Sequence, residues 1–133
     1  YNYKGSVFNT VMKMNSTTSI EAKVGLKKNT SGNFNHSNAT IYGSSTLTNW
    51  ACFSGDESGR TAVESNIPLD TNWNNHKLTL QTSDILYDIN GVLKVTKTDR
   101  LPTVENLQPQ AQMVSLNTDA KSLSIRYMEV YNT

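Results

Sequence analysis

The chain has 133 residues with a formal net charge of +1, and 17% of its residues are charged while 36% are hydrophobic. This length predicts one domain with a core of useful size, and a near-neutral chain without a basic cluster is not expected to bind nucleic acid, because such binding rests on phosphate neutralisation by Lys and Arg. No apolar run reaches the roughly 20 residues of a membrane span, so we expect no membrane insertion.

The chain starts at Tyr1 rather than Met, which favours a processed protein or a piece of a longer one, with residues 1–133 forming one domain. The first apolar segment, Val7 to Met14, predicts a strand covered on both faces. Alternation from Ile20 to Leu26 predicts a second strand with one wet face. These two segments are expected to form an antiparallel pair.

A polar loop from Lys28 to Asn38 follows, and loops of this kind are surface features that often carry function. Further strands are predicted at Thr40 to Tyr42, Leu47 to Ser54 and Thr61 to Ile67. Cys52, the single cysteine, excludes an internal disulfide and is interpreted as a small buried residue.

The hairpin from Ile85 to Val95 is the strongest local signal. Asn90-Gly91 stands between two alternating apolar runs, and a type I′ turn needs positive φ at both central residues, which Asn tolerates and Gly adopts freely. His76 to Gln81 predicts the strand before this hairpin.

Met113 to Leu116 and Leu123 to Tyr131 read as the last strands. About nine or ten short strands are separated by Gly, Pro and Asn turns, and no stretch has a sustained helical period. The pattern predicts an all-β fold, namely a two-sheet antiparallel sandwich or a barrel.

The second half of the chain resembles concanavalin A-like lectins and glucanases. The likeness rests on Trp73 and His76, the strand Ile85 to Ile89 with its Asn90-Gly91 turn, the exit at Leu101-Pro102, and the closing strand Leu123 to Tyr131. It covers roughly residues 73–131. The resemblance implies a jelly-roll sandwich of two curved antiparallel sheets, with ligands met on the concave face or on edge loops.

Three departures from that family's pattern bear on function. The paired acidic strand of its glucanases is missing, although retaining hydrolysis needs two carboxylates about 5 Å apart. Arg126 stands where relatives often place an Asp associated with calcium. Two residues separate Trp73 from His76, whereas the family's pattern has the Trp and the His next to each other. We therefore expect a protein that is not an enzyme and that has no cofactor or metal ion, the latter also because His36 and His76 lack partners at ligand spacing.

Exposed aromatic and amide side chains are the better candidates for binding, because sugars have apolar faces and polar rims. Trp50 has the opposite parity from Leu47 and Phe53, so it is predicted to face outward, the alternative being that it packs under a loop. The other predicted ligand-binding residues are Tyr42, Asp88 on the outer face of its strand, and His36 in the polar loop. The predicted core aromatics are Phe8, Phe53, Trp73, Tyr87 and Tyr127.

Two functions remain open at this point. The first is a non-catalytic recognition module of an extracellular, cell-surface or virion-surface protein that binds a glycan or another host-surface ligand. The second is a structural domain that assembles as a homo-oligomer or with virion or appendage proteins. A glycoside hydrolase with an unrecognised site is a remote third.

Overall fold

The computed structural model describes residues 5–29, 36–103 and 106–132. Ten strands make up its regular structure: β1 (Ser6–Met14), β2 (Ile20–Lys28), β3 (Asn38–Ser44), β4 (Asn49–Gly55), β5 (Arg60–Pro68), β6 (Asn74–Leu80), β7 (Ile85–Ile89), β8 (Val92–Lys97), β9 (Leu107–Ser115) and β10 (Leu123–Asn132). The prediction of an all-β chain is confirmed. Within the described residues, no helix is long and apolar enough to cross a membrane.

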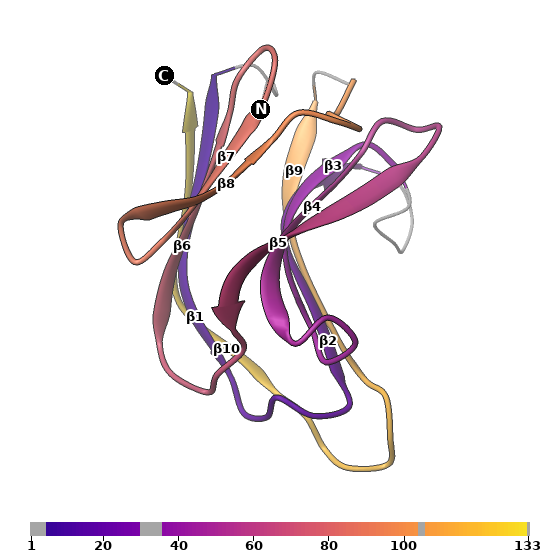
Figure 1. Cartoon of the computed structure of the whole chain (residues 1–133), viewed down its shortest axis with the longest axis vertical. Coiled ribbons are helices and arrows are strands. Elements are labelled where there is room, and N and C mark those ends of the chain that lie inside the picture. The colour runs from indigo at the N-terminus through magenta and orange to yellow at the C-terminus, as the bar shows by residue number, and fades with distance from the viewer. Residues whose placement is uncertain (1–4, 30–35, 104–105, 133) are drawn as a thin grey trace.

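The strands form two antiparallel sheets that pack face to face (Figure 1). Sheet A has the order β10-β1-β6-β7-β8, and sheet B has the order β5-β4-β3-β2-β9. The predicted pairing of the first two strands with each other is wrong, since β1 pairs with β6 and β10 in sheet A whereas β2 pairs with β3 and β9 in sheet B. The chain crosses from one sheet to the other between β1 and β2.

The curvature of the sandwich distinguishes its two outer surfaces. Both sheets bend in the same direction in Figure 1, so sheet B turns the hollow side of its curvature outward and sheet A turns its rounded side outward. We call these outer surfaces the B face and the A face. The core lies between the sheets, and alternate residues of each strand contribute to it.

The hairpin between β7 and β8 forms as its residues predict. Asn90 has φ 51° and Gly91 has φ 82°, as a type I′ turn requires. The Asn90 side chain also ties the turn to β6, because its Oδ1 accepts a hydrogen bond from the Asn75 N–H at 2.9 Å and its Nδ2 donates to Asn74 Oδ1 at 3.0 Å.

The predicted core is only partly correct. Phe8, Tyr87 and Cys52 are fully buried between the sheets. Phe53 is buried, but it lies on the B face rather than in the core, because its neighbour Cys52 faces inward. The predictions for two aromatics on sheet A are wrong. Tyr127 is 44% exposed and Trp73 is half-buried, because both lie on the A face.

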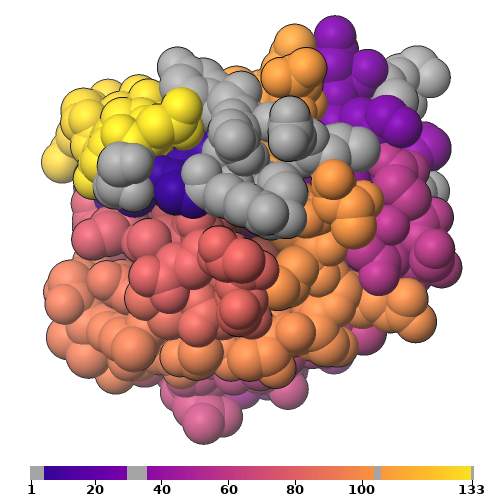
Figure 2. Space-filling model, turned by 90° about the horizontal axis from the view of Figure 1, so that it is seen from above, coloured from indigo at the N-terminus to yellow at the C-terminus, as the bar shows by residue number. Residues whose placement is uncertain are grey.

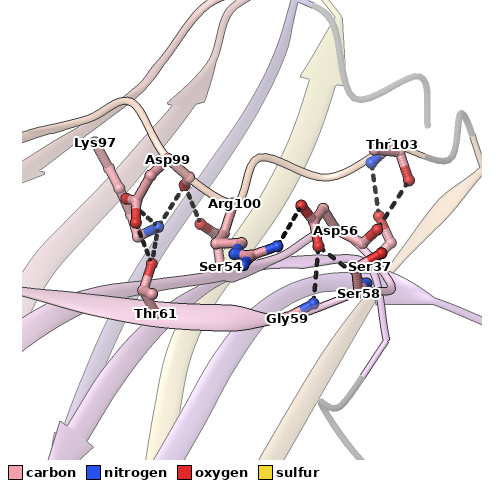
Figure 3. A network of polar contacts seen from close by, with 10 residues as sticks. All are labelled: Ser37, Ser54, Asp56, Ser58, Gly59, Thr61, Lys97, Asp99, Arg100 and Thr103. Atoms are coloured by element: carbon pink, nitrogen blue, oxygen red, sulfur yellow. Dashed lines mark hydrogen bonds and ion pairs between the residues drawn. The ribbon is translucent and has the colours of Figure 1, made fainter.

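One open side of the sandwich is closed by the segment that follows β8. Figure 2 shows this segment, in orange, lying against the magenta β4–β5 region. The buried ammonium of Lys97 reaches across from sheet A and donates to Thr61 Oγ1 at 2.8 Å, and Ser54 Oγ donates to the carbonyl oxygen of Asp99 at 3.4 Å. Figure 3 shows that this network continues through Arg100 and Thr103, which bond to Asp56 and Ser37 beside the ends of β4 and β3, so residues 98–103 are held against sheet B and its adjoining turns.

Candidate functional site

The B face is built by the alternate residues that sheet B turns away from the core. The registers of its five strands place two adjacent rows of side chains across the whole sheet. In strand order from β9 to β5, the first row is Gln112, Lys23, Tyr42, Ala51 and Glu64, and the second is Gln110, Gly25, Thr40, Phe53 and Ala62.

An aromatic pair lies at the centre of these rows. The rings of Tyr42 and Phe53 meet edge to face, with centroids 5.3 Å apart and planes at 65°. The Lys23 ammonium lies 5.6 Å from the Tyr42 centroid and 5.1 Å from that of Phe53, and it forms an ion pair of 3.2 Å with Glu21. The neighbours Gly25, Ala51 and Ala62 are small, so Lys23, whose ammonium lies over both rings, is the long side chain next to the pair in these rows.

His36 lies at one end of this face. Its Nδ1 is 3.0 Å from Glu57 Oε2, and the same carboxylate forms an ion pair with Lys28 at 3.2 Å. The hydrogen bond to His36 is the main cause of a lowered Glu57 pKa, with burial opposing it and Lys28 adding to it. Asn38, the B-face residue nearest in the chain, donates to the carbonyl oxygen of His36 at 2.8 Å.

The predicted outward orientation of Trp50 is wrong. Its side chain is 1% exposed and points into the core, where its ring lies 4.6 Å from that of His76 on the opposite sheet. Gly43 provides the space, since a Cβ there would come within 2.5 Å of the indole. Trp50 therefore cannot touch a ligand on the surface. Phe53 is the B-face aromatic that the sequence reasoning missed, and once Trp50 points inward, strand alternation places Phe53 outward.

Asp88 lies on an outer face, as expected, but that face belongs to sheet A. It pairs with Lys77 across β6 and β7 while its neighbours Tyr87 and Ile89 point into the core. The four predicted site residues therefore do not converge. Tyr42 is central on the B face, His36 lies at the end of that face, Trp50 is in the core, and Asp88 is on the opposite side of the molecule.

Two carboxylates of the described chain lie on the B face along β2 and β5, namely Glu21 and Glu64. Strands β3 and β4 separate them, and Glu21 lies two residues along the sheet from the row of Glu64, which puts their backbones about 16 Å apart at about 4.8 Å per strand and about 3.4 Å per residue. A retaining glycosidase holds its carboxyl groups about 5 Å apart and an inverting one at most about 9.5 Å apart. Residues 5–29, 36–103 and 106–132 also contain no group of three His, Cys, Asp or Glu side chains arranged to hold a metal ion.

Two buried ionisable groups of the core, His76 and Cys52, are kept neutral by burial. Burial lowers the pKa of His76 to about 3, against a smaller opposite effect of Asp70, and burial raises the pKa of the Cys52 thiol to about 12. A thiol that stays protonated is a poor nucleophile. These side chains are part of the core packing and do not form a second site.

Comparison with known proteins relates the chain to others through its fold. No protein-family model matches the sequence, and neither does any curated protein. Solved structures do match. The Caenorhabditis elegans galectin LEC-6 has a TM-score of 0.64 at 10% identity, over 97% of this chain and 84% of the galectin. The carbohydrate-binding module CBM66 from Bacillus subtilis has a TM-score of 0.66 at 10% identity, over 94% of this chain and 73% of the module.

A β-1,3-glucanase from Mycobacterium marinum matches with a TM-score of 0.70 at 10% identity, over 96% of this chain and 63% of the glucanase. The chain has the concanavalin A-like jelly-roll fold. The predicted resemblance is thereby confirmed for the fold. The concanavalin A-like sandwich is shared by lectins, binding modules and glycosidases, and this chain spans about two thirds of the length of the glucanase, so function must be argued from its own residues.

Proposed function

We propose that this chain is a non-catalytic carbohydrate-recognition module and that it binds its ligand on the B face. The observation that carries the proposal is the Tyr42–Phe53 pair in the middle of the outward concave sheet, with the Lys23–Glu21 ion pair beside it. The matches to a galectin and to a carbohydrate-binding module support a recognition role at the level of the fold.

The chemistry of the face suits a saccharide. A pyranose ring has an apolar side that stacks on an aromatic ring and a rim of hydroxyls that need hydrogen-bond partners. Tyr42 is the more exposed ring of the pair and provides the stacking surface, while Phe53, only 7% exposed, supports it from the side. Lys23, Gln110 and Gln112 lie in the same two rows and can form hydrogen bonds with the hydroxyls of the sugar.

The separation of Glu21 and Glu64 supports binding without hydrolysis, because the backbones of these two B-face glutamates lie farther apart than the carboxyl groups of either class of glycosidase. The neutral, amide-rich composition of the chain suits an extracellular or surface-exposed protein, including a cell-surface or virion protein, and we propose this setting.

Calorimetric titration against a panel of neutral oligosaccharides tests the proposal. We expect at least one to bind, and Tyr42→Ala to weaken it about tenfold or more, as removal of a stacking aromatic does. Asp88→Ala is the matched control, because it changes an outward residue on the other sheet and is expected to bind like the wild type. Absence of binding at millimolar ligand, or equal losses in both variants, would rule out a B-face site.

An assembly domain is the second candidate function, and edge strand β10 favours it. This strand has a neighbour on one side only, and Ile125, Tyr127 and Tyr131 are exposed along it. Unpaired edges of this kind pair readily with another chain. Light scattering on the purified protein tests this role, and a monomer at high micromolar concentration would contradict self-assembly.

A further inference from the structure

A cluster of two cations and one indole lies on the A face, away from the proposed sugar site. We call it the Trp73 cluster, and it consists of Lys13, Trp73 and Arg126. The three residues come from neighbouring positions of the sheet: Lys13 near the end of β1, Trp73 directly before β6, and Arg126 on β10. Met12 pairs with Asn74, so Lys13 and Trp73 continue that register on the outer side.

A bulge in β10 directs Arg126 toward this indole. Val11 pairs with Tyr127 and Met12 pairs with Ile125, which leaves Arg126 as the extra residue without a partner on β1. Bulges change the direction of a side chain and are over-represented at sheet edges and beside functional sites. The guanidinium carbon of Arg126 lies 4.2 Å from the Trp73 ring centroid, and the Lys13 ammonium lies 4.9 Å from it.

Within the described part of the chain, these two charges have no carboxylate as an ion-pair partner. Among the residues that the structure describes, neither Lys13 nor Arg126 has an acidic oxygen within ion-pair distance. The acidic groups closest in the sequence have other partners. Asp70 accepts a hydrogen bond from Asn74 Nδ2 at 2.8 Å, and Glu129 accepts one from Asn9 Nδ2 at 3.4 Å. Two like charges held on one ring are therefore left available to an external anion.

The surface next to the cluster is amphipathic. Tyr127, Val11 and Asn75 form the adjacent row across β10, β1 and β6, so an exposed phenol ring and an amide lie directly beside the two cations. An acidic peptide needs only the cations, whereas an acidic sugar also uses aromatic rings for its apolar face and an amide for its hydroxyls. Charge and surface together favour the sugar.

We propose that the Trp73 cluster binds an anionic saccharide, with Arg126 and Lys13 holding a sulfate or carboxylate group and the aromatic rings contacting the sugar ring. This site is separate from the proposed B-face site and does not depend on it. A chain with both sites would hold a neutral and an acidic saccharide on opposite sides of the sandwich.

The test is a titration of the whole chain with a sulfated hexasaccharide, followed by calorimetry and by tryptophan fluorescence. Trp73 reports directly on binding, because the other tryptophan, Trp50, is buried. We expect saturable binding, a change in emission that Trp73→Phe abolishes, and an affinity that falls with added salt. The affinity of the double variant Lys13→Gln/Arg126→Gln for the sulfated hexasaccharide is expected to be about tenfold or more lower than that of the wild type, because its charge-assisted hydrogen bonds are lost.

Matched controls separate this site from general charge and from the B face. Lys77→Gln/Lys94→Gln removes the same charge elsewhere on sheet A and is expected to bind like the wild type, as is Tyr42→Ala. Arg126→Lys keeps the positive charge. Its affinity, compared with that of Lys13→Gln/Arg126→Gln, tests whether the loss of affinity comes from the missing charge rather than from a disturbed bulge. Melting temperatures of all variants confirm folding.

Three results would overturn the proposal. The first is equal affinity of Lys13→Gln/Arg126→Gln and the wild type. The second is equal binding of the unsulfated hexasaccharide in the same fluorescence assay, because that ligand lacks the anion. The third is equal binding of an oligoglutamate of the same charge, which would identify a site for acidic peptides in place of a sugar site.

Discussion

The Tyr87 hydroxyl and the Nδ1 atom of His76 lie 2.8 Å apart and share a hydrogen bond in the centre of the sandwich. The two rings stack with their centroids 6.0 Å apart, and Trp50 meets His76 from sheet B. The Tyr87–His76 contact lies within sheet A, and the Trp50–His76 contact joins the two sheets through a histidine that burial keeps neutral.

The stability of the protein is expected to depend on pH through His76. Its pKa falls from 6.5 in the unfolded chain to about 3 in the folded one, so between these values only the unfolded chain takes up the proton. The free energy of unfolding is fully retained above pH 6.5 and falls as pH decreases from there, by about 2 kcal/mol between pH 7 and pH 5. Urea denaturation at these two pH values measures it. His76→Gln is expected to remove this difference in unfolding free energy between pH 7 and pH 5, and His36→Gln is expected to keep it. Equal unfolding free energies of the wild type at the two pH values would contradict the role of His76.

Gly91 is expected to be needed for its backbone conformation alone. Its φ is 82°, and a Cβ at this position would meet no atom within 4 Å. Gly91→Ala is therefore predicted to cost about 1 kcal/mol of unfolding free energy, from the strain of positive φ. Gly91→Asn is the control and should cost less, because Asn tolerates this conformation. Chemical denaturation would show the difference, and equal costs would point to some other role for Gly91.

Lys97 is expected to stabilise the closed side of the sandwich. Its buried ammonium donates to Thr61 Oγ1 at 2.8 Å, to the Asp99 carbonyl at 2.6 Å and to Asp99 Oδ1 at 3.0 Å. Lys97→Met removes three hydrogen bonds from a charged, buried donor, so we predict a loss of about 1–3 kcal/mol in the free energy of unfolding. Lys94→Met, at an exposed position on the same strand, should change stability by less than about 0.5 kcal/mol. Thermal melts of the two variants provide the comparison.

The inward position of Trp50 is expected to depend on Gly43. A Cβ at position 43 would lie 2.5 Å from Cζ3 of the indole, so Gly43→Ala overpacks the core at an expected cost of about 1–3 kcal/mol. In a Trp50→Phe background the ring is smaller and the same substitution should cost less. A double-mutant cycle measures this coupling. Purely additive effects would show that Gly43 is not what accommodates Trp50.

Much of the fold was predictable because its signals are local. Alternation along β7 and along the first half of β2 matches their burial, although Gly25 and Lys27 on the predicted wet face of β2 are buried, and the Asn90-Gly91 turn has the two positive φ values that its residues favour. The candidate site was less predictable. Tyr42 lies on the B face, but His36 is only at its end, and Asp88 belongs to the other sheet, since residues distant in sequence come together only through strand order.

Strand β4 shows that a sequence pattern can leave open which side of a strand faces the core. Asn49, Ala51 and Phe53 alternate with Trp50, Cys52 and Ser54, and both sets contain apolar residues. The period of two establishes that these sets face opposite ways, but it carries no preference for which set points inward. Trp73 and Tyr127 were misplaced for a related reason, because aromatic residues suit both a core and an exposed sheet face.

By itself, the sequence determined the class of fold, the type and approximate position of most of its strands and the tight turn of the β7–β8 hairpin, because backbone preference and side-chain alternation act over a few neighbouring residues. The tertiary structure decided which face of each strand became core and which side chains meet on the B face and in the Trp73 cluster. Those outcomes depend on contacts between residues of different strands and loops, such as Gly43 against Trp50 and Arg126 against Trp73, which form only when the sheets assemble and which no local pattern encodes.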